Sequence, residues 1–502
     1  MNLQDGMNKA IDYIERNLNG EIDYEEAARI CGCSLGRFQN LFQFVAGATP
    51  SEYVRKRRMT FAAEELISGN EKIIDLSMKF GYESPEAFAR AFQNFHGYPP
   101  SVTRKFGAYK KFNRLSVRIT IQGGCEMETH SKSKILKGVR PVGWGQTTAN
   151  PYVGAITACV DALRNNGSAD LPADPNSINS INSEYGDFRY AGMISGVGFS
   201  YTWSTAHSND ANMVDDATII RTFGALGYRV GIYRDGDTQN AQPSREKSFY
   251  AEKIISSVDR GFPVLGFGFT TDYPYACAIV GYENECERLY LRSYWEGDVP
   301  IGSETRHQTA MRDYQVMEDW YKYCRGIVVI EEKVSQALAG KNLLRHCLNA
   351  AVELSAQKTI EFYDLVLPCG LASYDAMVAV LEDDSFWAMR DEAFLRGMDK
   401  SYSCVGLLLA DHYRNWIARY WLAERADSSE AGKFIAEACE YYSLFGWLIN
   451  KTTGGHEGRT FLADPLDLEK REARLNMVPL IKILKRLDGA AVECFKKALE
   501  LL

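Results

Sequence analysis

The sequence lacks the features that would place the protein in a membrane, outside the cell or around a metal ion. No run approaches the roughly 18 apolar residues of a membrane-spanning helix, and the opening MNLQDGMNKA has neither the basic nor the apolar stretch of a signal peptide. The 12 cysteines are scattered, and the closely spaced Cys31 and Cys33 have no second cluster to complete a zinc site. We therefore expect a cytoplasmic protein with reduced thiols, no membrane partner and no metal or other cofactor.

A strongly basic region is also missing. The net charge of the 502 residues is −8, but residues 1–111 hold 15 Lys and Arg against 14 Asp and Glu, so the negative charge lies almost wholly beyond residue 111. Because nucleic acid is polyanionic, we expect any such partner to meet the N-terminal part. A chain of this length is too long to fold around one hydrophobic core and is typical of about three domains.

What the N-terminal part does contain is an internal repeat. CGCSLGRFQNLFQFVAGATP matches FGYESPEAFARAFQNFHGYPP at a spacing of fifty positions, aligning Phe38 with Phe88, Phe42 with Phe92 and Pro50 with Pro100. Gly32 and Gly81 mark a tight turn before the second helix of each copy. Each copy is therefore predicted to be a helix, a glycine turn and a second helix, which is the helix-turn-helix motif.

Capping residues predict where these helices begin. Asp23, with Glu26 three residues later, forms a capping box, and Ser34 and Ser84 are expected to cap the second helix of each copy. Residues 51–67 are predicted to form a longer helix that joins the two copies.

The second helix of each copy has an aromatic face and a polar face. The aromatic positions recur at i, i+3 and i+4, so we expect them to pack on the leading helix: Phe38, Leu41, Phe42, Phe88, Ala91 and Phe92. The opposite faces carry Gly36, Arg37, Gln39 and Asn40 in the first copy and Glu86, Ala87, Ala89 and Arg90 in the second. Gln, Asn and Arg can pair bidentately with adenine or guanine edges in the major groove.

At these residues the sequence resembles the AraC family of bacterial transcription regulators. The signature runs through IDYIERNLNGEIDYEEAARICGCSLGRFQNLFQ, GATPSEYVRKRRMTFAAEELI and IIDLSMKFGYESPEAFARAFQNFHGYPPS, nearly all of residues 8–104. The resemblance implies an all-α DNA-binding domain over residues 1–111. In such a domain, two helix-turn-helix units enter successive major-groove segments of double-stranded operator DNA, about 34 Å apart.

The resemblance also assigns contacts. Gly36, Gln39 and Asn40 would face bases in the first unit, and Glu86 and Arg90 in the second. Gly36 has no side chain and Glu86 can only accept a hydrogen bond, so we expect less base readout than usual from the first unit.

A run of four cations, RKRR, lies near the start of the joining helix. Arg55, Lys56 and Arg57 are predicted to reach phosphates or solvent. The alternative for the whole region is a helical domain with a merely solvated polar face. Its near-zero charge favours that alternative, whereas the cation run and the repeat favour DNA binding.

After residue 111 the sequence changes character. Residues 112–134, including SVRITIQGG, are interpreted as a short strand and a linker. Residues 135–335 begin with helical segments and continue with GFPVLGFGF, YACAIVGY, RLYLRSYW and GIVVIEE, a pattern typical of an α+β domain with an antiparallel sheet. Their order resembles papain-like domains of the C39 peptidase type and, more closely, BtrH-like relatives.

The places where such peptidases hold cysteine, histidine and aspartate are occupied here by Tyr152 or Val153, Tyr275 and Ser293. Without a thiolate, an imidazole and a carboxylate, no nucleophile can be activated, so we expect a catalytically dead sensor. Cys159 and Cys277 lie in apolar segments typical of buried thiols.

Aromatic residues lie in the segments that would line the former catalytic cleft. Such a cleft would bind a small aromatic or apolar ligand. The predicted ligand contacts are Tyr152, Tyr190, Tyr201, Trp203, Tyr275 and Trp295. The alternative for each ring is an ordinary place in the core.

Residues 336–502 are interpreted as wholly helical, with broad apolar faces. They could pack on the sensor, form a homodimer or cap the ligand cleft, and the sequence does not decide among these roles. The complete prediction is a cytoplasmic, ligand-responsive transcription regulator. The alternatives are a DNA-binding module fused to an active thiol hydrolase or acyltransferase, for which Cys159, Cys277 and His207 are the available side chains, and a ligand-sequestering resistance protein.

Overall fold

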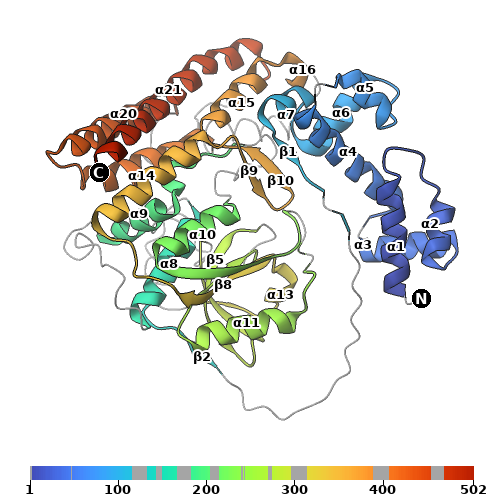
Figure 1. Cartoon of the computed structure of the whole chain (residues 1–502), viewed down its shortest axis with the longest axis horizontal. Helices are drawn as coiled ribbons and strands as arrows, with labels where there is room; N and C mark the ends of the chain where they lie inside the picture. Colours follow the sequence, from blue (N-terminus) through green and yellow to red (C-terminus); the bar gives the residue numbers. More distant parts are fainter. Residues whose placement is uncertain are drawn as a thin grey trace. The chain divides into compact units, whose positions relative to one another are not determined.

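A computed structural model divides the chain into two compact units (Figure 1). Unit 1 comprises Met1–Thr129 and Asp364–Leu367, and unit 2 comprises His130–Tyr363 and Pro368–Leu502. The structure describes all residues except 1–2, 47, 70, 113, 116–132, 143–149, 167–182, 204–213, 239–240, 242, 270–273, 295–313, 388–405 and 454–467. Within the described residues, no helix is both long and apolar enough to cross a membrane.

Unit 1 is helical, with one short pair of strands. Its elements are α1 (Leu3–Arg16), α2 (Tyr24–Cys31), α3 (Leu35–Ala46), α4 (Pro50–Ser68), α5 (Ile73–Lys79), α6 (Pro85–His96), α7 (Pro100–Phe106), β1 (Tyr109–Lys110) and β10 (Leu365–Pro368). These helices include the two helix-turn-helix copies that the repeat predicts, α2–α3 and α5–α6.

The helix caps explain where these helices begin. The Asp23 carboxylate accepts hydrogen bonds from the backbone N–H groups of Glu25 and Glu26, as predicted. Glu26 does not complete the predicted capping box, because its side chain pairs with Arg29 one turn later. The complete capping box lies at the start of α4 instead, between Thr49 and Glu52.

The predicted cap of the sixth helix is also present. Ser84 Oγ accepts a hydrogen bond from the Ala87 N–H at 3.1 Å. In the glycine turns, Gly32 and Gly81 both have a φ of +81°, a left-handed conformation that favours glycine.

Helix α4 contributes to both hydrophobic cores of unit 1. Tyr53 and Val54, near its start, pack with Phe38 and Phe42 of the first copy. One turn further on, α4 joins the core of the second copy, to which it supplies Met59, Ala62, Ala63 and Leu66. A continuous helix of 19 residues, about 28 Å long, therefore carries both copies.

The second copy is completed by residues far along the chain. β1 pairs antiparallel with β10, with Tyr109 opposite Val366 and Lys110 opposite Leu365. Val366 is buried in the same cluster as Phe88 and Phe92. The core of the second helix-turn-helix thus includes a side chain that lies almost 280 positions after those phenylalanines in the sequence.

Unit 2 combines an antiparallel sheet with many helices. Its elements are β2 (Lys134–Ile135), α8 (Pro151–Asn165), α9 (Ser183–Ser195), η1 (Val197–Phe199), α10 (Asp216–Ala225), β3 (Tyr228–Arg234), α11 (Lys247–Asp259), β4 (Val264–Phe267), β5 (Ala276–Glu283), β6 (Arg288–Ser293), β7 (Gln315–Met317), α13 (Trp320–Tyr323), β8 (Gly326–Lys333), α14 (Gly340–Ala356), β9 (Thr359–Phe362), α15 (Leu371–Glu382), α16 (Asp384–Trp387), α18 (Gly406–Asp411), the π-helix η3 (His412–Arg419), α19 (Tyr420–Ala423), α20 (Glu430–Thr453) and α21 (Arg471–Leu501).

The central strands of the sheet in unit 2 are buried on both faces. Its strand order is β3-β8-β4-β5-β6-β7, with β2 paired to β5, and the pairings are antiparallel as the sequence predicts. Neighbouring residues alternate between two cores: Leu265 and Val328 pack in one, and Val264 and Ile327 in the other. The predicted α+β character of this region is therefore present.

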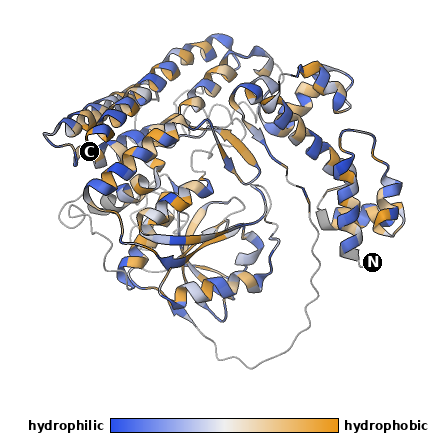
Figure 2. Cartoon of the chain, in the orientation of Figure 1, coloured by the Kyte–Doolittle hydropathy of each residue, from blue (hydrophilic) through white to orange (hydrophobic). Residues whose placement is uncertain are grey.

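The region 336–502 is not wholly helical as predicted. Strands β9 and β10 interrupt it. The sequence did not predict them, because in apolar runs this short the hydrophobic spacing does not distinguish a strand from part of a helix. The remaining helices are amphipathic, and Figure 2 shows hydrophobic and hydrophilic residues alternating along α20 and α21. Residues 336–363 and 368–502 group with the sheet in unit 2.

A buried ion pair ties together the helical layer of unit 2. The Arg414 guanidinium, on the π-helix, lies 2.7 Å from the Asp488 carboxylate on α21, and both side chains are almost fully buried. The Tyr374 hydroxyl of α15 donates to the same carboxylate at 3.0 Å. Burial of this pair is tolerable because both charges are hydrogen-bonded.

Candidate nucleic-acid interface and a cavity in the second unit

The polar face of α3 is exposed. Phe38 and Phe42 are buried on the opposite side, as predicted, while Leu41 is half-buried. The exposed positions include all four that the sequence assigned to this face: Gly36, Arg37, Gln39 and Asn40. An idealised Cβ at Gly36 would meet no atom within 4 Å, so this position is open to solvent.

The corresponding face of α6 is also exposed. Phe88 and Phe92 are buried, whereas Glu86 and Arg90 are exposed one turn apart and Ala91 is half-buried. Asn94, one turn further on, continues the exposed stripe. Both second helices of the repeat therefore present side chains with hydrogen-bonding groups to solvent.

The cation run divides into exposed and structural members. Arg55 is exposed, and Lys56 is half-buried with its ammonium 5.1 Å from the Phe112 ring centre. Arg57 is buried: Nε and Nη2 donate to the Glu15 carboxylate at 2.8 and 2.7 Å. The prediction that Arg57 reaches phosphates or solvent is therefore wrong, because this buried guanidinium is held by the half-buried Glu15 carboxylate within unit 1.

Arg58 is likewise structural. It donates to the backbone carbonyls of Leu18 and Gly20, which satisfies acceptors after the end of α1. Of the RKRR run, Arg55 and Lys56 remain as candidates for phosphate contacts.

One exposed residue of the α3 face was not among the predicted contacts. Phe44 is 89% exposed, on the face that also carries Asn40. The signal was an apolar residue four positions after Asn40, on a face otherwise assigned to polar side chains.

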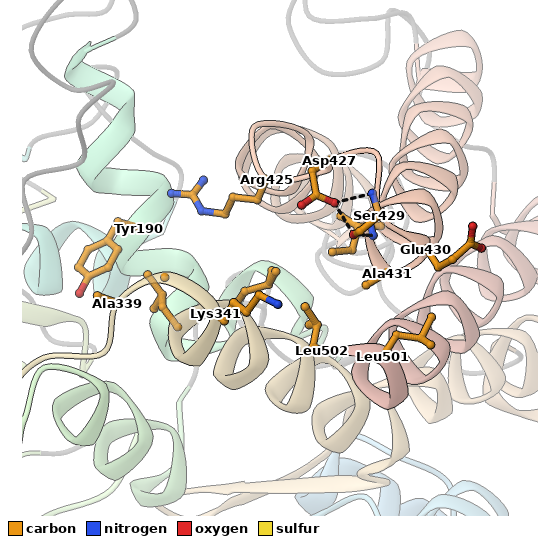
Figure 3. A pocket seen from close by; sticks show the side chains of 15 residues that line it. Tyr190, Ala339, Lys341, Arg425, Asp427, Ser429, Glu430, Ala431, Leu501 and Leu502 are labelled. Carbon is orange, nitrogen blue, oxygen red and sulfur yellow. Dashed lines mark hydrogen bonds between the residues drawn. The ribbon is translucent and has the colours of Figure 1, made fainter.

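Unit 2 contains a cavity of about 530 Å³ between helix ends. Its wall comprises Tyr190 of α9, the start of α14, the segment between α19 and α20, the start of α20 and the end of α21. The apolar lining includes Leu343, Leu344, Ile435 and Leu501, and the charged lining includes Lys341, Arg425, Asp427 and Glu430. Figure 3 shows Asp427 hydrogen-bonded to Ser429, which caps the start of α20.

The aromatic residues predicted to bind a ligand do not gather in this cavity. Tyr152, Tyr201 and Trp203 are buried in unit 2, and the Tyr152 hydroxyl lies 2.8 Å from Thr222 Oγ1. Tyr190 lines the cavity and Tyr275 is half-buried, while Trp295 lies outside the described residues. Their roles as ligand contacts stay predictions.

The two candidate thiols of unit 2 are buried. Cys159 and Cys277 belong to one apolar cluster, and burial raises the pKa of the Cys159 thiol to about 12. Burial also raises the pKa of Cys277 well above its usual value. Both side chains are therefore protonated near neutral pH. His207 lies outside the described residues.

Comparisons with known proteins identify the N-terminal region. A helix-turn-helix domain family matches residues 27–105. Over 90 residues the chain is 33% identical to the multiple antibiotic resistance protein MarA of Escherichia coli, a stretch that covers 18% of this chain and 71% of MarA. Over 92 residues it is 33% identical to the HTH-type transcriptional activator AarP of Providencia stuartii, covering 18% of this chain and 68% of AarP.

A third relative is matched over a longer stretch. The chain is 31% identical over 141 residues to the uncharacterized HTH-type transcriptional regulator YbfP of Bacillus subtilis, covering 28% of this chain and 45% of YbfP. The chain therefore spans less than half of YbfP.

A crystal structure of an AraC-type transcriptional regulator from Chromobacterium violaceum is similar at 23% identity, covering 19% of this chain and 86% of that one, with a TM-score of 0.19. Because the family match falls on the two helix-turn-helix copies, and the alignments with MarA and AarP cover more than two thirds of each of those proteins at 33% identity, the chain belongs to the AraC family of helix-turn-helix transcription regulators.

Proposed function

We propose that this protein is a ligand-responsive transcription regulator in which unit 1 binds operator DNA and unit 2 binds a small molecule without converting it. The observation that carries the proposal is the pair of exposed faces on α3 and α6, which α4 holds through two separate cores. Asn40 on α3 and Arg90 on α6 have the side chains that suit adenine and guanine edges.

The cavity of unit 2 supports a ligand-binding role. Its volume of about 530 Å³ falls in the range of small-molecule sites, and it combines aliphatic walls with a few charged groups. A ligand with an apolar body and a polar end would satisfy both parts of this lining.

The buried thiols support binding without turnover. A papain-like reaction needs a thiolate beside an imidazole, and neither Cys159 nor Cys277 is ionised near neutral pH. We infer that unit 2 derives from a papain-like, BtrH-like scaffold that has lost its chemistry.

The chain path offers a route from ligand to DNA. Asp364–Leu367 belongs to unit 1, but the residues on both sides of it in the chain belong to unit 2. A change of conformation in unit 2 would therefore act on a strand whose Val366 side chain lies in the core beneath α6. Ligand binding can shift DNA affinity by this route only if the ligand prefers one of the two states.

Alanine substitutions test the DNA contacts. We expect Asn40→Ala and Arg90→Ala to weaken binding to a selected operator by about 1–3 kcal/mol each and to leave random duplex binding nearly unchanged. Arg55→Ala should weaken both duplexes alike and lower the salt dependence by about one ion. Fluorescence anisotropy on the two duplexes measures both effects. Equal losses on both duplexes for Asn40→Ala and Arg90→Ala would refute the base-reading assignment.

A cavity-filling substitution tests the ligand site. Leu344→Trp should abolish binding of an amphipathic dye such as anilinonaphthalene sulfonate, while the same change at exposed Ile483 should not. To test for turnover, a small molecule that binds the full chain is incubated with it for a prolonged time, and the small molecule is then examined by mass spectrometry for conversion. Ligand conversion that is blocked by a thiol-alkylating reagent would favour the thiol-enzyme alternative.

A further inference from the structure

Phe44 is the most exposed large apolar side chain described in the protein, at 89%. Covering a phenylalanine ring stabilises a protein by about 1.5–3 kcal/mol relative to leaving it in water. Within unit 1, Phe38 and Phe42 of the same helix are buried in the core, whereas Phe44 is not part of that core.

The position of Phe44 on α3 places it on the DNA-reading face. It lies four residues after Asn40 and seven after Arg37, and residues at these spacings share one face of a helix. Arg37 and Asn40 are both exposed. The ring therefore continues the exposed stripe by one further turn.

The major groove offers one apolar group to such a ring. Thymine carries a 5-methyl group there, whereas the other groove edges are hydrogen-bond donors and acceptors. A single exposed ring flanked by polar residues is also too small for a protein interface, which needs about 800 Å² on each partner.

We propose that Phe44 is a specificity-determining residue that packs on the 5-methyl group of a thymine adjacent to the base pair contacted by Asn40. This proposal rests on the proposed binding of operator DNA by unit 1. It predicts that the half-site under α3 is read partly through an apolar contact.

The second copy of the repeat provides an internal control. The residue fifty positions after Phe44 is Asn94, which is exposed on α6. An amide in that place can hydrogen-bond to a base edge but offers no aromatic surface to a methyl group. We therefore expect the methyl dependence to be confined to the half-site read by α3.

The experiment removes the methyl group alone. A preferred duplex is selected from a random pool with the full chain, and each thymine is then replaced singly by deoxyuridine. We expect one replacement in one half-site to weaken binding by about tenfold, equivalent to a typical good base contact. Phe44→Ala should lose about the same affinity on the unmodified duplex and show no further loss with deoxyuridine at that position.

Two further variants define the outcome. Phe44→Leu should recover part of the methyl dependence, and Asn94→Ala should retain all of it. The proposal is overturned if no single deoxyuridine weakens the wild-type complex, or if Phe44→Ala keeps the full penalty. Absence of any selected sequence would instead refute operator binding itself, so the two failures are distinguishable.

Discussion

The two helix-turn-helix copies share a sequence pattern but are completed in different ways. The first is built mainly from α1, α2, α3 and the start of α4, with the Glu15–Arg57 ion pair linking α1 to α4, and Phe112 and Leu115 pack against its core. The second depends on β1 and on β10, whose sequence lies far beyond the repeat. The described core of the first copy therefore takes no residue from beyond Leu115, whereas the core of the second includes Val366.

A buried histidine is a second difference between the two copies. His96, at the end of α6, is buried: its Nδ1 accepts the Lys110 N–H at 3.1 Å, and its Nε2 donates to the Met59 carbonyl at 2.9 Å. Burial lowers the pKa of His96 to about 3. This neutral ring links α6 to both α4 and the strand that pairs with β10.

The largest expected effect falls on the first copy. Arg57→Ala removes the cation from the half-buried Glu15 carboxylate and leaves it only the Tyr53 hydroxyl as a partner, so we expect unit 1 to lose about 3–4 kcal/mol of stability. Hydrogen exchange followed by mass spectrometry should show reduced protection in α1 and α2. The matched control Arg55→Ala, at an exposed position of the same run, should change stability by less than about 0.5 kcal/mol. Comparable losses in both variants would contradict the structural role of Arg57.

A charge placed in the second core should affect only that copy. Val366→Asp inserts a carboxylate beside Phe88 and Phe92, and we expect a loss of about 3 kcal/mol. Exchange should rise in α5 and α6 but not in α2 and α3, and operator affinity should fall. Val366→Ala should cause the same pattern at roughly 1–2 kcal/mol. Unchanged exchange in α6 would show that this core does not need the distant strand.

Lowering the pH should also affect the stability of the two copies differently. The folded-state pKa of His96 lies below its usual value of about 6.5, so below that pH the unfolded chain gains a proton that the folded one does not. Stability of the second copy should therefore fall as the pH drops from 6.5 towards 3, by about 2 kcal/mol at pH 5. No histidine precedes His96 in the sequence, so this contribution is absent from the first copy. Hydrogen exchange, corrected for the pH dependence of intrinsic exchange rates, measures the stability of each copy. An equal loss of protection in α2 and α3 would rule out His96 as the source of the pH dependence.

The smallest expected effect is at Gly36. Because a Cβ there meets open space, Gly36→Ala should stabilise α3 by about 0.5 kcal/mol through its higher helix propensity. Thermal denaturation with exchange in α3 as the local readout would detect it. A clear loss of stability would mean that the glycine serves a packing role.

Sequence patterns with local causes were predictable. The spacing of Phe38 and Phe42 and of their counterparts Phe88 and Phe92 established both buried faces, since helical period and apolarity act within a few residues. Ser84 could be assigned as a cap for the same reason, because the backbone N–H of Ala87 that donates to it lies three residues away. The exposure of Asn40 and Arg90 could then be predicted, because they lie on the opposite faces of the same helices.

Which charged side chains are exposed and which are buried could not be predicted in the same way. Arg55 and Arg57 are two positions apart with the same side chain, yet one is exposed and the other is buried against Glu15. The aromatic residues of unit 2 show a similar limit, because Tyr152 and Tyr190 differ in surroundings that no local pattern encodes.

By itself, the sequence determined the repeat, the helices that compose it, its buried and exposed faces and hence its family. Each of these depends on side-chain spacing along one short segment. Only the tertiary structure decided that Val366 enters the second core, that His96 is neutral and that Arg57 is not free to meet DNA. These depend on which distant residues pack together, since burial and pairing energies arise from contacts in space and have no signature in local sequence.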